Sequence, residues 1–413
     1  MKILFPYLAR WRSANRSRYH QLLTHLCSLG HQVYVLTAPE MAVMDISARD
    51  LDSGGDDCLP AGMTVSELYA PSAFRTFWQH RIPRTRLFKK GVVSLTSINQ
   101  VRRFISKEKI DTLFVYNLPQ APLLHVAECR THFDLADDLV AMMRVEHEHL
   151  AGFGGMATAC AVQRHMISRA DTVTVASSVL AGVLDKQGKR RALMLPNGAD
   201  VAELDKAGPN AWRARHPGPV VGFVGAFEYW VDFDLVLRMA QAMPRVTFLL
   251  VGGGRRLKWV KDDVAARGLS NVCLTGAVPY REAMDYVAGM DVCLLPFTHD
   301  AVSDGSCPLK LFEYAALRKP IVSTTTREVM RIGNGWIEFA DDEQDFQAAV
   351  ESFLADSRAA ARAGEAGRTL VEQVYNWPIL ARRFEELLIK GAAPGLEPAA
   401  AQRAVLDTLK IRV

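Results

Sequence analysis

Residues 304–314 begin as a loop of small residues and continue as a predicted helix, between two apolar segments. The strand-like segment 291–297 precedes the run, and Lys319–Val322 follows it as the next predicted strand. Strands joined in this way by a helix are typical of a parallel sheet. The loop that opens the helix then presents free backbone N–H groups, and the positive end of the helix dipole, at the carboxyl edge of that sheet.

Two charged side chains in this run have the spacing needed to hold a nucleotide diphosphate. Lys310 lies in the first turn of the predicted helix, where its ammonium can meet a phosphate, and Glu313 lies one turn later, where its carboxylate can accept hydrogen bonds from ribose. The alternative is an ordinary helix with Pro308 at its first position and Glu313 in solvent. Because Lys310 and Glu313 are three residues apart, they share a helix face, which favours the binding site.

Four glycine-containing motifs accompany this run. They are Leu195–Asp200, Val221–Gly225, Phe248–Gly254 and Leu274–Tyr280. In this order, over residues 195–325, the set resembles nucleotide-sugar glycosyltransferases of the GT-B fold, including family 4 enzymes and the xanthan glucuronosyltransferase. The resemblance implies an α/β chain of two Rossmann-like domains whose parallel sheets face each other across a cleft.

The resemblance also assigns a role to Glu313. In these families the second glutamate of a Glu-x7-Glu motif holds the ribose, and Glu313 matches it, whereas the first glutamate is replaced by Gly305. The missing glutamate fits inversion at the sugar carbon and the family 4 likeness fits retention, so the stereochemistry stays open. The donor implied is a UDP-sugar, with GDP as the alternative, and no permanently bound cofactor or metal is expected.

A leaving diphosphate gains negative charge, so fixed N–H donors and a cation should stabilise it. The candidates in the predicted loop and helix are Gly305, Ser306, Leu309 and Lys310. Gly225 ends the first strand of the C-terminal half, where backbone can approach phosphate closely or simply turn. Gly253 and Arg255 end the next strand and are candidates for the base pocket and a phosphate contact, with a surface arginine as the alternative.

Two adjacent carboxylates, Asp137 and Asp138, end a possible strand at 131–135 in the N-terminal half. Like charges in a cleft raise the pKa of one carboxyl group, which suits a general base. The resemblance to the xanthan enzyme places Asp137 on its catalytic aspartate, while Asp138 is the alternative base. Either residue would equally serve as the cap of the following helix.

The loop after the first strand, residues 9–18, carries four arginines, Arg10, Arg12, Arg16 and Arg18. It should face the cleft, because it follows the carboxyl end of that strand. Four arginines there suit an anionic acceptor, such as a lipid-linked pyrophosphate saccharide or an acidic sugar.

Segment 75–90 contains six cations, three large aromatic residues and no acid, and a fourth aromatic residue, Phe74, directly precedes it. This mixture suits contact with an anionic membrane and equally a solvated basic loop. It also leaves a rival function open, that of a non-catalytic protein binding membrane or nucleic acid.

The chain of 413 residues is long enough for two domains. We expect an acceptor-binding domain over 1–200 and a nucleotide-sugar-binding domain over 201–375. A helix near 376–390 should return to the first domain, and a tail at 391–413 should begin with a poorly ordered stretch at 391–400. Residues 40–65 are predicted to be a loop and 123–129 a helix.

The composition and a few sequence features limit the cellular location and the partners expected for the protein. The chain has 49% hydrophobic and 23% charged residues and no apolar run as long as a membrane span. The apolar run at the N-terminus is too short for the hydrophobic region of a signal peptide. Seven scattered cysteines favour a reducing cytoplasm, and we expect the protein to lie there at the inner face of the cell membrane. A net charge of +4 does not call for nucleic acid as a partner. The His and Glu residues at 146–149 have the wrong spacing for a metal site on a helix.

Overall fold

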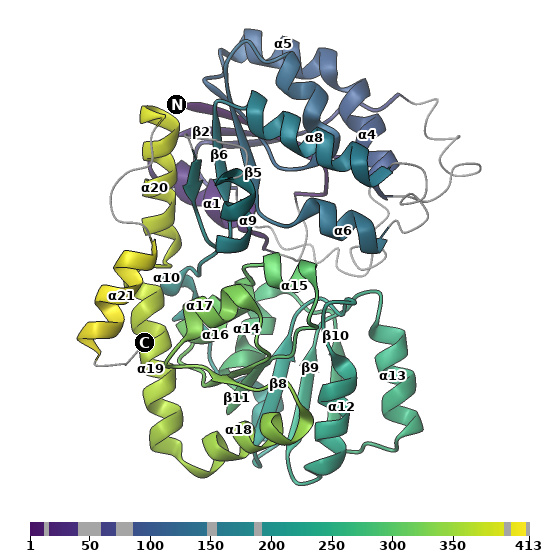
Figure 1. Ribbon diagram of the computed structural model, residues 1–413, viewed down its shortest axis with the longest axis vertical. Helices are drawn as coiled ribbons and strands as arrows, with labels where there is room; N and C mark the ends of the chain where they lie inside the picture. The colour runs from purple at the N-terminus through teal and green to yellow at the C-terminus, as the bar shows by residue number, and fades with distance from the viewer. Residues whose placement is uncertain are drawn as a thin grey trace.

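The computed structural model describes residues 1–11, 16–39, 59–71, 86–146, 155–185, 192–391 and 398–409. Figure 1 shows two domains stacked end to end, with the N-terminal domain in purple to teal and the C-terminal domain mainly in green. Each domain is a parallel sheet with helices against it. This is the architecture that the sequence predicts.

The N-terminal sheet has seven strands in the order β3-β2-β1-β4-β5-β6-β7. The strands are β1 (Lys2–Tyr7), β2 (Gln32–Thr37), β3 (Met63–Glu67), β4 (Thr112–Val115), β5 (Arg130–Leu135), β6 (Thr172–Val175) and β7 (Ala192–Met194). The helices described around it are α1 (Arg18–Ser28), α4 (Arg86–Thr96), α5 (Ile98–Glu108), the 3₁₀ helix η2 (Leu118–His125), α6 (Leu139–Glu146), α8 (Gly155–Arg169) and α9 (Ser178–Asp185). Short helices α10 (Val201–Leu204) and α11 (Ala211–Ala214) lead into the second domain.

The C-terminal sheet has six strands in the order β10-β9-β8-β11-β12-β13. The strands are β8 (Val220–Val224), β9 (Thr247–Val251), β10 (Val272–Gly276), β11 (Val292–Leu295), β12 (Ile321–Ser323) and β13 (Glu338–Phe339). The helices are α12 (Phe233–Ala242), α13 (Leu257–Ala266), α14 (Tyr280–Ala288), α15 (Ala301–Gly305), α16 (Leu309–Ala316), α17 (Arg327–Gly333), α18 (Glu343–Ala355) and α19 (Ser357–Gln373). The strand order reverses between β8 and β11, and ligands of such sheets bind at the carboxyl ends of the strands beside that point.

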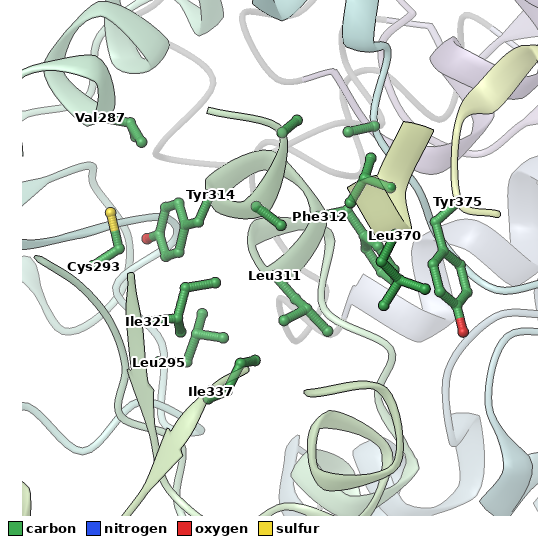
Figure 2. Close-up of a cluster of buried hydrophobic side chains, with 14 of the residues drawn as sticks. Val287, Cys293, Leu295, Leu311, Phe312, Tyr314, Ile321, Ile337, Leu370 and Tyr375 are labelled. Atoms are coloured by element: carbon green, nitrogen blue, oxygen red, sulfur yellow. The ribbon is translucent and has the colours of Figure 1, made fainter. Parts of the chain in front are cut away.

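Helix α16 is anchored in the C-terminal core by the apolar side chains of its buried face. Figure 2 shows Tyr314 pointing toward Cys293 and Phe312 lying near Leu370 and Tyr375. The Tyr314 hydroxyl accepts a hydrogen bond from the backbone N–H of Val224 at 2.8 Å, which joins the helix to β8. Because its buried face is fixed in this way, the start of α16 has a defined position at the edge of the sheet.

The chain passes between the domains twice, and the two crossing segments lie side by side. The Ala199 N–H donates to the Tyr375 carbonyl at 3.0 Å, and the Trp377 N–H donates to the Ala199 carbonyl at 3.1 Å. A Cβ at Gly198 would lie 2.1 Å from the Tyr375 carbonyl oxygen, so only glycine allows this approach. After the second crossing, α20 (Trp377–Lys390) packs its buried face against α1 of the N-terminal domain (Figure 1).

Three local predictions differ from the structure. The predicted loop at 40–65 runs into β3, which begins at Met63. The predicted α-helix at 123–129 is instead the 3₁₀ helix Leu118–His125, because Pro122 inside it cannot donate an α-helical hydrogen bond. The stretch 391–400 overlaps a further helix, α21 (Pro398–Thr408), which packs on α19, while residues 392–397 lie outside the described part.

Candidate functional site

A cavity of about 310 Å³ lies between the domains, where the C-terminal strand order reverses. It combines an apolar wall with a few polar groups from both domains. The lining residues are Asp137, Met142, Phe223, Gly225, Ala226, Trp230, Phe297, Val302, Ser303, Ser306, Pro308, Leu309 and Lys310. Five of the predicted site residues, Asp137, Gly225, Ser306, Leu309 and Lys310, are therefore brought together around one space.

Lys310 and Glu313 form an ion pair on α16, with Lys310 Nζ 2.8 Å from Glu313 Oε2. Pro308 is the residue before the helix, so the first free N–H of the helix belongs to Leu309. Glu313 is only 3% exposed, and the alternative in which it faces solvent is wrong. Lys310 lines the cavity, where its charge can meet a phosphate.

Tyr280 and Arg16 complete a polar cluster around Glu313. Only its place in a motif pointed to Tyr280, so its part in the site was not predicted. Burial raises the pKa of Tyr280 well above its ordinary value, and the charge of Glu313 and a hydrogen bond to it raise that pKa further. The Arg16 guanidinium lies 5.7 Å from the centre of the Tyr280 ring. Arg16 comes from the N-terminal domain, so it reaches across to the residues expected to hold the nucleotide.

Asp137 faces the cavity from the N-terminal domain, after the end of β5. Its side chain is exposed, and it opens into a cavity that residues of both domains line. Desolvation by this protein raises the pKa of Asp137, and the nearby charge of Asp134 raises it further, while Arg18 lowers it. A carboxylate with a raised pKa and access to a cavity has the properties of a general base.

Asp138 has a different role. Its Oδ1 accepts a hydrogen bond from the Ala141 backbone N–H at 2.8 Å, so it caps the start of α6. A Cβ added at Gly305 would lie 3.2 Å from the Asp138 Cβ. Asp138 is therefore a cap and a domain contact, and of the two adjacent carboxylates only Asp137 lines the cavity.

The glycine loop after β9 packs on the loop after β8 and does not line the cavity. Gly252 has a φ of +141°, and a Cβ there would lie 1.9 Å from the Gly225 carbonyl oxygen. The Gly253 carbonyl accepts a hydrogen bond from Phe227 N–H at 2.9 Å. Arg255 pairs with Glu228 instead of pointing into the cavity. Gly253 and Arg255 thus support the Gly225 loop from outside.

The predicted acceptor arginines are only partly described. Arg10 is half-buried at the carboxyl end of β1, and Arg16 contacts Tyr280. Arg12 lies outside the described residues, as do residues 75–85 of the basic segment 75–90; the last residues of the segment begin α4. Within the described ranges, no three His, Cys, Asp or Glu residues gather as a possible metal-ion site.

A buried network behind Asp137 was missed by the sequence analysis, and it contains Arg18, which the sequence had placed among the acceptor arginines but which is buried. The Arg18 guanidinium donates to both oxygens of Asp134, at 2.9 and 3.1 Å, and to the side-chain oxygen of Asn197 at 3.0 Å. Thr174 Oγ1 also donates to Asp134. Arg18 begins α1, Asp134 lies in β5 and Asn197 lies in the linker, so no short-range spacing in the sequence relates them. The network fixes the end of β5, from which Asp137 projects.

Comparisons with known proteins identify what this chain is similar to. Residues 218–356, most of the second domain, match the family Glycosyl transferases group 1. A curated relative is TuaH of Bacillus subtilis (strain 168), assigned as a teichuronic acid biosynthesis glycosyltransferase. It is 29% identical over 198 residues, which cover 46% of this chain and 50% of the relative.

Solved structures share the whole architecture at low sequence identity. Sucrose-phosphate synthase from Thermosynechococcus elongatus has a TM-score of 0.74 at 17% identity, covering 94% of this chain and 98% of that one. HepE from Anabaena, in complex with UDP and glucose, has a TM-score of 0.66 at 15% identity, covering 94% and 100%. The fold is GT-B, which confirms the fold predicted from the sequence.

Proposed function

We propose that this protein is a glycosyltransferase that moves a sugar from a nucleotide diphosphate sugar to a saccharide acceptor. The observation that carries the proposal is one cavity lined by Asp137 from the first domain and Lys310 from the second. A base and a phosphate-binding cation on opposite walls are what a displacement at the sugar carbon requires. The group 1 family match over residues 218–356 supports the same reaction class.

Each group has a distinct part in this reaction. Lys310 and the free N–H groups at the start of α16 bind the diphosphate and stabilise the charge that it gains on leaving. Glu313, held by Lys310 and Tyr280, accepts hydrogen bonds from the ribose hydroxyls. Asp137 takes the proton from the acceptor hydroxyl as the new glycosidic bond forms.

The donor proposed is a UDP-sugar. Support comes from HepE, a structure of the same fold that is described in complex with UDP and glucose and with UDP-glucose. In the structure of this chain, Glu313 lies one helical turn beyond Lys310 and beside Tyr280, so a ribose and a diphosphate can be held by the same helix.

The acceptor proposed is a lipid-linked or polysaccharide chain at the inner face of a membrane. The relative TuaH is assigned to the biosynthesis of a polysaccharide. None of the described helices is both long and apolar enough to cross a bilayer. A peripheral contact through segment 75–90 would bring the cleft to a lipid-linked acceptor, since each cation near an anionic surface contributes about 1 kcal/mol.

Two measurements test the proposal. A thermal-shift screen of UDP- and GDP-sugars should raise the melting temperature only for the donor nucleotide, because a ligand of the native state stabilises it. The pure protein should also hydrolyse that donor slowly or transfer its sugar to an added acceptor. Absence of both effects, together with duplex binding that falls steeply with salt, would favour the rival nucleic-acid function.

The membrane step has its own test. The protein should co-sediment with phosphatidylglycerol vesicles more than with neutral vesicles. Charge reversal at Arg81, Arg84 and Arg86 should remove the difference. Equal binding to both kinds of vesicle would leave an acceptor that is reached from solution.

A further inference from the structure

A buried carboxylate joins the two domains beside the cavity loop. Glu328, in the first turn of α17, is fully buried, and its Oε2 accepts hydrogen bonds from the Ser178 N–H at 3.0 Å and the Ser178 hydroxyl at 2.7 Å. Ser178 is the first residue of α9 in the N-terminal domain, so the carboxylate lies at the positive end of that helix. This contact crosses the domain boundary with no ligand involved.

The charge of Glu328 is satisfied within its own domain. Arg331, three residues later in α17, donates to Oε2 at 3.1 Å and to Oε1 at 2.6 Å. A buried carboxylate paired in this way is held in one orientation and does not carry an uncompensated charge. Glu328 can therefore serve as a fixed acceptor for the other domain.

The residue next to Ser178 holds the loop that leads into α16. Ser177 Oγ donates to the Gly305 carbonyl at 2.8 Å, and the Asn197 side-chain amide donates to the Cys307 carbonyl. Gly305 is the last residue of α15 and Cys307 lies in the short connection to α16, just before Leu309 and Lys310. Groups of the N-terminal domain and of the first crossing segment thus fix this loop at two points.

The same segments also determine the position of Asp137. Ser177 and Ser178 follow β6, and β6 pairs with β5 along four residues, up to Leu135 opposite Val175. Asp137 follows β5 by two residues. A displacement of α9 away from Glu328 would therefore move Ser177 off the Gly305 carbonyl and move Asp137 away from Lys310.

We propose that Glu328 is a positioning residue that acts through Ser178 to set the separation between Asp137 and Lys310 across the cleft. The inference rests on the proposed transfer reaction, in which these two residues act on one substrate. Such a residue touches neither donor nor acceptor. Its loss should impair the geometry of the reaction and leave nucleotide binding by the C-terminal domain intact.

The test uses Ser178→Ala, which removes one bond to Glu328 and little volume, and Ser178→Thr, which keeps the hydroxyl. Ser357→Ala is the matched control, because Ser357 is also the first residue of a helix but is exposed and far from the boundary. We expect Ser178→Ala to lower kcat about tenfold at unchanged Kd for UDP, Ser178→Thr to restore it, and Ser357→Ala to match the wild type. A wild-type kcat in Ser178→Ala, or a parallel loss of UDP affinity, would overturn the proposal.

A second readout needs no activity. Small-angle X-ray scattering of the ligand-free protein should give a larger radius of gyration for Ser178→Ala and Glu328→Gln than for the wild type and Ser357→Ala, with circular dichroism confirming that each variant is folded. If the wild type transfers no sugar, the proposed function fails while scattering still decides this inference. Equal radii for all folded variants would overturn it.

Discussion

Gly305 and Asp138 face each other across the domain boundary, and a Cβ at position 305 would come within 3.2 Å of the Asp138 Cβ. In the Glu-x7-Glu motif of the enzymes that the sequence resembles, the first glutamate would fall at Gly305. A longer side chain at this position would press on Asp138 of the N-terminal domain. Asp137, the neighbour of Asp138, supplies a carboxylate to the cavity from the opposite wall.

Restoring the motif with Gly305→Glu should reduce activity. The new side chain would force Asp138 and α6 away from α15, and such overpacking costs about 1–3 kcal/mol of unfolding free energy. Gly182→Ala is the matched control, because a Cβ at this helical glycine meets nothing within 4 Å; it should be neutral or slightly stabilising. Denaturant unfolding and turnover of both variants check this, and a more active, equally stable Gly305→Glu protein would contradict it.

Asp137→Asn should lower kcat strongly, whereas Asp138→Asn should retain most activity. Asp137→Asn removes the proposed proton acceptor at nearly constant volume, so kcat should fall by about 10²–10⁴-fold with donor affinity unchanged. Asp138→Asn keeps an N-cap acceptor for Ala141 and should retain most activity. Steady-state kinetics with calorimetric UDP binding separates the two effects. Full activity in Asp137→Asn with loss in Asp138→Asn would move the role by one residue.

The raised pKa of Asp137 has two consequences for pH dependence. The base must be ionised, so the acid limb of the kcat profile should lie at higher pH than for an ordinary aspartate. The folded state also disfavours the charged form, so this group's contribution to stability is lost as pH rises from the ordinary pKa through the raised one.

Asp137→Asn should therefore melt at a higher temperature than the wild type near neutral pH. The difference should vanish below the ordinary aspartate pKa, where both proteins carry a neutral group. Thermal melts across the pH range, with Asp138→Asn as the control, measure this. A difference that persists in acid would point to packing instead of ionisation.

Glu313→Ala should weaken binding of UDP by about 1–3 kcal/mol, the range for a lost hydrogen bond to a charged group. The effect comes from the lost ribose contact and from Lys310, which loses its 2.8 Å partner. Glu386→Ala, which removes an exposed carboxylate from α20, should not change the affinity. Isothermal calorimetry with UDP and GDP decides the point, and unchanged affinity for both nucleotides would remove Glu313 from the site.

The sequence predicted the local part of this site well. Lys310 and Glu313 are three residues apart, so their shared helix face follows from helical geometry alone. Gly225, Ser306 and Leu309 also line the cavity, because the carboxyl ends of parallel strands meet at one edge.

Contacts between distant segments could not be predicted. Arg18 and Asp134 are 116 residues apart, and Ser178 and Glu328 are 150 apart, so no spacing rule relates them. The choice between Asp137 and Asp138 depended on which side chain turned to the cap and which to the cavity. For Arg255, the partner Glu228 lies on the neighbouring loop, and this pairing draws the guanidinium away from the cavity.

The tail helix α21 provides the last prediction, because it anchors the point where the chain crosses between domains. Gln402 is buried and accepts a hydrogen bond from the Tyr375 hydroxyl at 2.8 Å, while its amide donates to the carbonyls of Arg331 and Ile332 at 2.9 and 3.0 Å. Tyr375 lies in the second crossing segment, and Arg331 holds Glu328. Part of the predicted tail is thus a helix, and it is hydrogen-bonded to the second crossing segment and to α17.

Gln402→Ala should lower the free energy of unfolding by about 1–3 kcal/mol, because it leaves buried polar groups without partners. Gln347→Ala, at an exposed position of α18, is the control and should change stability by less than about 0.5 kcal/mol. Denaturant melts give both values. If α21 contributes only to stability, kcat of Gln402→Ala stays at the wild-type value below the melting transition. A kcat that falls about tenfold, as expected for Ser178→Ala, would instead place α21 in the same junction as Glu328. Equal stability of both glutamine variants would show that α21 is not anchored by Gln402.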